Sequence, residues 1–352
     1  LGLLKTSDSA ARGAEGSADQ CSDGAGNTIP LYVSETEVYA VGSGTGTSHT
    51  AFGKDCGVDL AAGTGNSLFG EGAGADVSTG EHNVAVGYHA LFQGTTETDD
   101  NVAIGYNAMS GAIVGESVND CVAIGSAALS GALDSSNGIL EASGTVAIGT
   151  NALTNITTGA GNVAVGHNAG NYNATGGENT YLGYQAGYGA SGQNHSTNTA
   201  VGFKALYDIT DGAGNVAVGK NALFNVAGGD YNVGIGEDAG RDINTGEHNI
   251  AIGYHAGLTI TDHNRNIAIG TNSLDAAVDG GGANVAIGFA SLGTLNHDAA
   301  DENVAIGSYA GEGATTMLKA TIVGASACGS GTITSAAEGI VAVGHKIGRA
   351  HV

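Results

Sequence analysis

The sequence contains no tryptophan, one proline and only six phenylalanines in 352 residues. Without large aromatic side chains a wide globular interior is difficult to fill, so a thin and elongated core fits better. The near absence of proline and the lack of a three-residue glycine period exclude a collagen triple helix. No hydrophobic run approaches the length of a membrane span, so this segment is not expected to insert into a membrane. The sequence starts at Leu1 without a signal-peptide pattern, and we expect that an upstream segment was removed or is not included.

Basic residues are also scarce, with 10 Lys and Arg against 34 Asp and Glu, which gives a net charge of −24. A surface of this charge repels polyphosphate, so the chain is not expected to bind nucleic acid, and binding to anionic membranes is disfavoured for the same reason. Acidity at this level suits solubility in salty water or weak binding of divalent cations.

The four cysteines, Cys21, Cys56, Cys121 and Cys328, form no CxxC pair and have no zinc-ligand spacing. They are interpreted as structural thiols, with a Cys21–Cys56 disulfide as the alternative.

Sixty-three glycines are present, and 41% of the residues are hydrophobic, so the chain should fold rather than remain disordered. A motif recurs that reads Asn, Val or Ile, Ala, Ile or Val, Gly, then two variable residues and usually Ala. Clear copies begin at Asn83, Asn215, Asn249 and Asn303. Nine of the seventeen intervals between motif glycines are seventeen residues long, and the glycines stand at positions 42, 53, 70, 87, 105, 125, 149, 166, 183, 202, 219, 236, 253, 270, 288, 307, 324 and 344.

This period is too short for helical-pair repeats or propeller blades but suits one coil of a solenoid. The sequence therefore predicts an all-β, parallel β-solenoid of about eighteen coils, roughly 85 Å long. Alternation within the motif predicts a strand, with Val and Ile facing the coil interior and Ala and Gly forming a smooth outer face suited to self-association. A second, weaker strand is expected over 153–157, closed by a turn over 158–161.

Stacking identical coils would align the motif asparagines into an amide ladder, with each amide donating to and accepting from its neighbours. The predicted ladder comprises Asn66, Asn83, Asn101, Asn162, Asn179, Asn198, Asn215, Asn232, Asn249, Asn266, Asn284 and Asn303. Structural turn glycines are assigned at Gly87, Gly105, Gly166, Gly219, Gly253 and Gly307.

The predicted domains are a non-repetitive segment over 1–37, the solenoid over 38–348 and a short tail over 349–352. Longer intervals place insertions at 109–120, 130–144, 187–197 and 293–302, all on one edge of the coil. Loops on one face of a solenoid often carry its function. The longest insertion, Ser130 to Gly144, is the candidate receptor contact, with tolerated surface variation as the alternative.

Residues 101–109 read Asn-Val-Ala-Ile-Gly-Tyr-Asn-Ala-Met. These repeats resemble the head repeats of YadA-type trimeric autotransporter adhesins and the related repeats of phage and bacterial tail fibres. The resemblance covers roughly residues 38–348. It implies a left-handed parallel β-roll, three chains packed side by side into a fibre, and a role in attachment.

No catalytic, cofactor-binding or metal-binding residue is assigned. The GxGxxG match at Gly187 to Gly192 lacks a βαβ context and is attributed to the high glycine content. The histidine pairs His82–His89 and His248–His255 occupy equivalent positions and are interpreted as facing solvent. Aromatic residues make up only 5% of the chain, which speaks against the aromatic platforms of polysaccharide-cleaving β-helices. Loosely bound Ca²⁺ in acidic loops, or an axial ion in a trimer, remains open.

The sequence thus predicts an extracellular, non-catalytic structural fibre, on a cell surface or a virion, that acts as spacer and adhesin. Its expected partners are further copies of itself in a homotrimer and an unknown surface receptor or glycan. A filament subunit stacking end to end is the alternative. An ice-binding solenoid is less favoured, because that function needs aligned threonines in successive coils.

Overall fold

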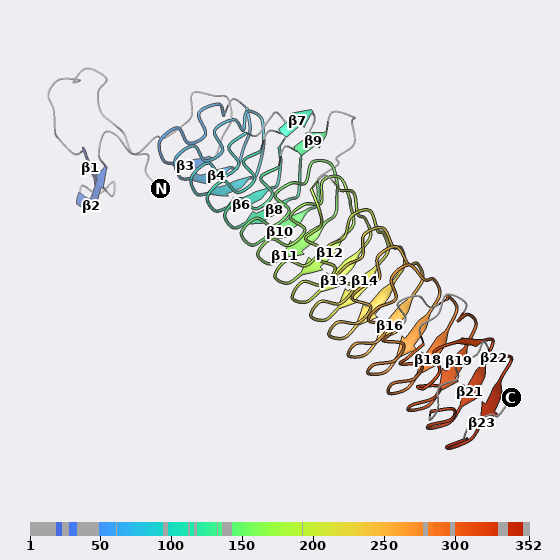
Figure 1. The fold of residues 1–352 in the computed structure, drawn as a ribbon. Coiled ribbons are helices and arrows are strands. Elements are labelled where there is room, and N and C mark those ends of the chain that lie inside the picture. Colours follow the sequence, from blue (N-terminus) through green and yellow to red (C-terminus); the bar gives the residue numbers. More distant parts are fainter. Residues whose placement is uncertain are drawn as a thin grey trace.

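The computed structural model describes residues 19–22, 28–33, 49–60, 62–93, 98–111, 113–115, 118–131, 133–135, 143–191, 193–276, 281–295, 300–329 and 337–347. Every regular element in these ranges is a β-strand. The coils stack into a parallel β-solenoid with a period near seventeen residues, which confirms the predicted fold class (Figure 1). The first predicted coil, which ends at Gly42, lies outside the described residues.

Each coil contributes one three-residue strand to a single long sheet. In order along the rod its strands are β3 (Thr50–Phe52), β4 (Ser67–Phe69), β5 (Val84–Val86), β6 (Val102–Ile104), β8 (Val122–Ile124), β10 (Val146–Ile148), β11 (Val163–Val165), β12 (Thr180–Leu182), β13 (Thr199–Val201), β14 (Val216–Val218), β15 (Val233–Ile235), β16 (Ile250–Ile252), β17 (Ile267–Ile269), β18 (Val285–Ile287), β19 (Val304–Ile306), β21 (Thr321–Val323) and β23 (Val341–Val343).

The remaining strands form three small two-stranded sheets. In the non-repetitive segment, β1 (Asp19–Ser22) pairs antiparallel with β2 (Thr28–Val33). In the insertions at 109–120 and 130–144, β7 (Ile113–Gly115) pairs in parallel with β9 (Leu133–Ser135). Outside the insertions, β20 (Met317–Leu318) pairs in parallel with β22 (Ala337–Glu338). The β7–β9 pair lies at one edge of the coil stack (Figure 1).

The register of the long sheet follows the motif. Val216 pairs with Val233, and Ala217 pairs with Gly234, one coil further on. The Val216 N–H donates to Asn232 O at 2.8 Å, so the ladder begins at the motif asparagine. Equivalent residues therefore lie one strand spacing apart, roughly 4.8 Å, along the whole rod.

The expected second strand over 153–157 is wrong, because this segment is a series of turns. After each motif glycine the backbone enters the left-handed region twice, as at Asn151 (φ 55°) and Leu153 (φ 48°). A left-handed residue turns the chain sharply and cannot continue an extended strand. Each repeat is consequently a coil with one strand and a long turning return.

The assignment of Val and Ile to the interior is also wrong. In β5, Ala85 is fully buried, whereas Val84 and Val86 are only partly buried and face outward. The same inside-Ala pattern holds in nearly every strand of the sheet. The interior opposite the strand is already filled by Leu and Ile from the return segment, such as Leu223 and Ile243. A coil this narrow has room for only a methyl group on the strand side.

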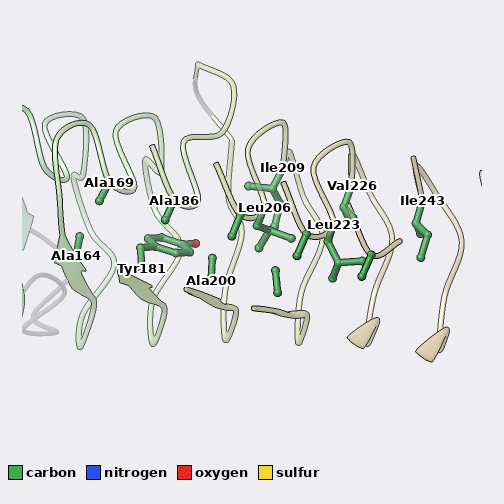
Figure 2. Close-up of a cluster of buried hydrophobic side chains, with 14 of the residues drawn as sticks. Ala164, Ala169, Tyr181, Ala186, Ala200, Leu206, Ile209, Leu223, Val226 and Ile243 are labelled. Carbon is green, nitrogen blue, oxygen red and sulfur yellow. The ribbon is translucent and has the colours of Figure 1, made fainter. Parts of the chain in front are cut away.

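Four described coils depart from the alanine rule, with Leu68, Tyr181, Gly234 and Ile322 at the inward position of the strand. Tyr181 replaces the strand alanine and is completely buried between Ala164 and Ala200 (Figure 2). Gly170 and Gly187 flank it where other coils carry Leu, and a Cβ at Gly187 would lie 2.3 Å from Tyr181 Cε1. The tyrosine ring is thus accommodated by the absence of two side chains from the facing column.

Candidate functional site

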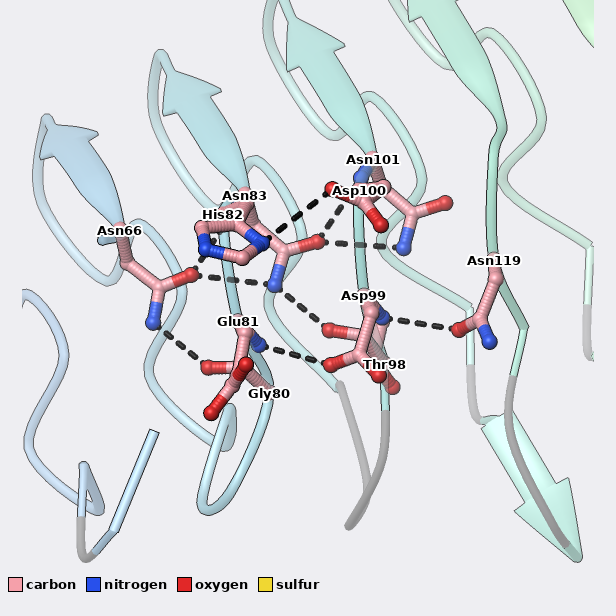
Figure 3. Close-up of polar contacts among 10 residues, drawn as sticks. All are labelled: Asn66, Gly80, Glu81, His82, Asn83, Thr98, Asp99, Asp100, Asn101 and Asn119. Atoms are coloured by element: carbon pink, nitrogen blue, oxygen red, sulfur yellow. Dashed lines mark hydrogen bonds and ion pairs between the residues drawn. The ribbon is translucent and has the colours of Figure 1, made fainter. Parts of the chain in front are cut away.

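The motif asparagines form a buried ladder along the coil interior. Asn83 Nδ2 donates to Asn66 Oδ1 at 3.1 Å and to Thr98 O at 2.6 Å (Figure 3). The Asn83 backbone N–H also donates to Asn66 Oδ1, at 2.8 Å. Each carboxamide therefore links the strand of one coil to the return turn of the next. The members Asn66, Asn83, Asn101, Asn162, Asn179, Asn198, Asn215, Asn232, Asn249, Asn266, Asn284 and Asn303 are all buried.

The ladder runs in two stretches. The first ends where the backbone N–H of Cys121 donates to Asn101 Oδ1, and the second ends where that of Ala320 donates to Asn303 Oδ1. Thr145, also buried, stands between the two stretches. Every member of the ladder forms hydrogen bonds with a neighbouring coil and none faces solvent. The ladder therefore holds the coils together and is not a ligand site.

The motif glycines have φ between +126° and +143°, a region that side chains rarely adopt. An added Cβ would also collide with the next motif glycine. At Gly166 it would lie 2.3 Å from Gly183 O, and at Gly219 it would lie 2.6 Å from Gly236 O. Gly87, Gly105, Gly253 and Gly307 have the same geometry. These glycines are structural, since their backbones stack directly on one another.

The outward side chains of the sheet form two columns, here called the outer sheet face. One column is apolar from Phe52 to Val343. Several of its members have more than a third of their surface exposed, including Leu182 at 48% and Ile306 at 39%. Threonine occupies the other column only at Thr50, Thr180, Thr199 and Thr321, so the described coils carry no continuous threonine row of the kind that ice binding requires. A contiguous apolar surface of this length is a candidate interaction site.

The paired histidines lie outside the core. His82 and His248 are exposed, and His82 Nδ1 lies 3.4 Å from Asp100 Oδ1 (Figure 3). His89 stacks on Tyr88 and His255 on Tyr254, with ring centroids 3.9 Å and 3.8 Å apart. Among the described residues, no group of three His, Cys, Asp or Glu side chains is arranged to hold a metal ion.

An aromatic patch lies on the return segments of four consecutive coils. It comprises two rows of rings and one lysine, namely His167, Tyr184 and Phe203 in the first row, Tyr172, Tyr188, Tyr207 and Phe224 in the second, and Lys204. Tyr184 and Phe203 have 44% and 46% of their surface exposed, and the second-row rings are partly exposed. Burial raises the pKa of Tyr188 to about 12, helped by its hydrogen bond with Tyr172, so this phenol keeps its proton at neutral pH.

The patch was missed in the sequence because an average aromatic content says nothing about position. The signal that could have found it is the offset from the motif glycine. Tyr184 and Phe203 follow their glycines by one residue, and Tyr188, Tyr207 and Phe224 follow theirs by five. In a solenoid, equal offsets in consecutive coils become neighbours in space.

A buried Tyr–His pair anchors the insertion at 187–197. The Tyr181 hydroxyl and His195 Nδ1 are 2.6 Å apart, and both side chains are fully buried. His195 Nε2 has no hydrogen-bond partner among the described residues, and a Cβ at Gly189 would lie 2.9 Å from it. Burial lowers the pKa of His195 from 6.5 to about 4, since a protonated ring could not be solvated here.

This pair predicts an acid-sensitive stability. The unfolded chain takes up a proton on His195 below about pH 6.5, whereas the folded chain does so only near pH 4. Stability is therefore complete above pH 6.5 and is lost as pH falls between these values, by about 3 kcal/mol. Thermal unfolding followed by circular dichroism across this range should show the decline. His195→Asn should flatten the profile, while His248→Gln, at an exposed site, should leave it unchanged.

The cysteines and the candidate receptor loop are the remaining features that the sequence singled out. Cys56 and Cys328 are buried and form no disulfide, so the Cys21–Cys56 disulfide is not present, and Cys121 is buried in the asparagine column. Burial raises the pKa of Cys56 and Cys121 to about 11, which leaves both thiols protonated. Most of the candidate receptor loop over 130–144 lies outside the described residues.

Searches of known proteins identified no relative. No family model matches the chain, no curated protein is similar to it, and no solved structure matches it. Within the described ranges, no helix is present that could cross a membrane.

Proposed function

We propose that the chain is the subunit of an extracellular, non-catalytic structural fibre, in which copies pack side by side through the outer sheet face and the rod acts as spacer and adhesin. The observation that carries this proposal is the apolar column of the sheet, which continues through every described coil. Side-by-side packing would remove this surface from water, at about 25 cal/mol per Å² of apolar area.

The geometry of the face supports packing between copies. Its strands are short, parallel and in one register, so the columns form a regular ridge roughly 80 Å long. Ridge and groove repeat at the strand spacing on every copy, and identical faces can interdigitate along their whole length. A homotrimer is the arrangement that the repeat resemblance implies, and it encloses the apolar columns of all three copies around one axis.

The long-range charge shapes this association. At −24 each copy repels the others at low ionic strength, and the repulsion is screened beyond about 8 Å in physiological salt. Association should therefore strengthen as salt is added, which is the behaviour of an apolar contact between acidic bodies.

Native mass spectrometry and analytical ultracentrifugation in physiological salt test the proposal. The wild-type chain should form a trimer, and the double variant Val218→Lys with Ile252→Lys should sediment as a monomer. Thr150→Lys with Thr245→Lys adds the same charge on exposed return segments and should leave the trimer intact. A wild-type chain that stays monomeric at micromolar concentration would overturn the proposal.

A further inference from the structure

The aromatic patch presents ring edges and hydroxyl groups rather than a continuous set of ring faces. Tyr188 and Tyr207 stack with centroids 5.0 Å apart and planes within 3°, and Tyr207 stacks on Phe224 at 4.9 Å. Neighbouring rings therefore cover one another's faces. Ring edges carry the positive end of the aromatic quadrupole, and protonated phenols donate hydrogen bonds, so the exposed border of the rows favours acceptors and anions.

The rows do not cover every face. Tyr172 meets Tyr188 edge to face, with an interplanar angle of 87°. Phe203 and Phe224 are the last rings of their rows in the described coils, since the equivalent positions in the following coils are Lys220 and Arg241. The ends of the patch therefore offer ring surface on which a flat apolar group can stack.

Lys204 places a positive charge between the two rows. Its ammonium lies 4.6 Å from the Tyr207 ring centroid, 5.7 Å from that of Phe203 and 6.0 Å from that of Phe224. By contrast, Lys54, Lys220 and Lys319 each pair with a glutamate of the next coil, at 3.6, 2.6 and 3.2 Å. Among the described residues Lys204 forms no ion pair, so its charge is available to a ligand.

One carboxylate lies close to this lysine. Burial raises the pKa of Asp208, and the charge of Lys204 lowers it by less, which places the two groups within electrostatic reach. No ion pair joins them in the described structure. An anionic ligand would thus compete with a weakly interacting neighbour rather than displace a formed salt bridge.

We propose that the aromatic patch binds a linear, anionic polysaccharide, with Lys204 contacting a carboxylate or sulfate group. This proposal deepens the attachment role proposed above and rests on it. A polymer of repeating sugars suits a surface that itself repeats at every coil, roughly every 4.8 Å along the rod. Gln185, at the coil position of Lys204, adds an amide group that can hydrogen-bond to sugar hydroxyls.

The acidity of the rod is compatible with this ligand. In physiological salt, charges further than about 8 Å from the contact are largely screened, whereas Lys204 would touch the ligand directly. The patch also extends over four consecutive coils, which fits a polymer lying along the rod axis better than a small molecule.

Binding measurements with defined polysaccharides test the site. Affinity electrophoresis and isothermal titration calorimetry would use polygalacturonate for carboxylates, chondroitin sulfate for sulfates and dextran as the neutral polymer. The wild-type chain should bind one or both anionic polymers and not dextran. Lys204→Gln and Tyr207→Ala should each weaken binding by at least about tenfold.

Matched controls separate the patch from the rest of the rod. Lys220→Gln removes the same charge at an ion-paired lysine, and Tyr254→Ala removes an exposed ring outside the patch, so both should bind like wild type. Circular dichroism would confirm that each variant is folded. No binding by a wild-type chain that still forms trimers would overturn the glycan site alone. Equal binding by Lys204→Gln and Lys220→Gln would assign the affinity elsewhere, and binding to dextran alone would exclude an anionic ligand.

Discussion

Replacing Gly219 with alanine should destabilise the middle of the rod by about 4 kcal/mol or more. Its φ of +133° is unfavourable for a side chain, and the new Cβ would lie 2.6 Å from Gly236 O. To relieve that contact the two coils must separate, which would break the hydrogen bonds from Gly236 N to Val218 O and from Asp238 N to Lys220 O. Thermal unfolding would show the loss, and hydrogen exchange would locate it in β14 and β15.

Gly228→Ala is the matched control for this substitution. The φ of Gly228 lies outside the left-handed region between +20° and +160°, and a Cβ there would meet no atom within 4 Å. The stability of the Gly228→Ala variant should stay within about 0.5 kcal/mol of wild type. If the two alanine variants unfold alike, close stacking of motif glycines is not what holds the coils in register.

Replacing Asn232 with alanine should cost about 3 to 5 kcal/mol. Asn232 Oδ1 accepts the Asn249 backbone N–H at 2.9 Å, and its Nδ2 donates to Gly246 O at 2.7 Å. Truncation leaves that N–H and that carbonyl buried without partners, in addition to a cavity. The resulting loss of stability can be measured by chemical denaturation of the wild type and the variant under identical conditions.

Two further variants make the ladder prediction specific. Asn232→Asp keeps the shape but turns the donor toward Gly246 O into an acceptor, so it should be at least as damaging as alanine. Asn244→Ala changes an exposed asparagine of the same coil and should have little effect. A mild Asn232→Asp phenotype would show that packing, rather than donation across coils, is what the ladder provides.

The architecture could be predicted from the sequence because, in a solenoid, residues that lie one period apart in the sequence are neighbours in space. The interval between motif glycines equals the separation between paired strand residues, as in the pairing of Val216 with Val233. The asparagines recur at a fixed offset in the sequence, and the structure stacks them at the strand spacing. Any column of identical residues can be read in this way, because each coil contacts mainly the coils before and after it.

The aromatic patch and the Tyr181–His195 pair were harder to predict, since they join different residue types at different offsets. Tyr181 stands in the strand and His195 in an insertion, fourteen residues apart. The two meet only because Gly170 and Gly187 leave space for the tyrosine ring. A repeat pattern compares equivalent positions of successive coils. It does not show contacts that depend on the side-chain sizes at other positions of the coil.

By itself, the sequence determined the coil, its period, the asparagine column and the glycines that allow coils to stack. Only the tertiary structure decided which side of the strand faces inward. Alternation of Val, Ala and Ile is the same pattern in either orientation, and the expectation that larger apolar residues face inward was wrong. Leucine and isoleucine from the return segment occupy the interior of each narrow coil, which leaves space for Ala85 but not for Val84 or Val86. The apolar residues that the sequence assigned to the core therefore form the outer sheet face, through which we propose that copies of the rod pack.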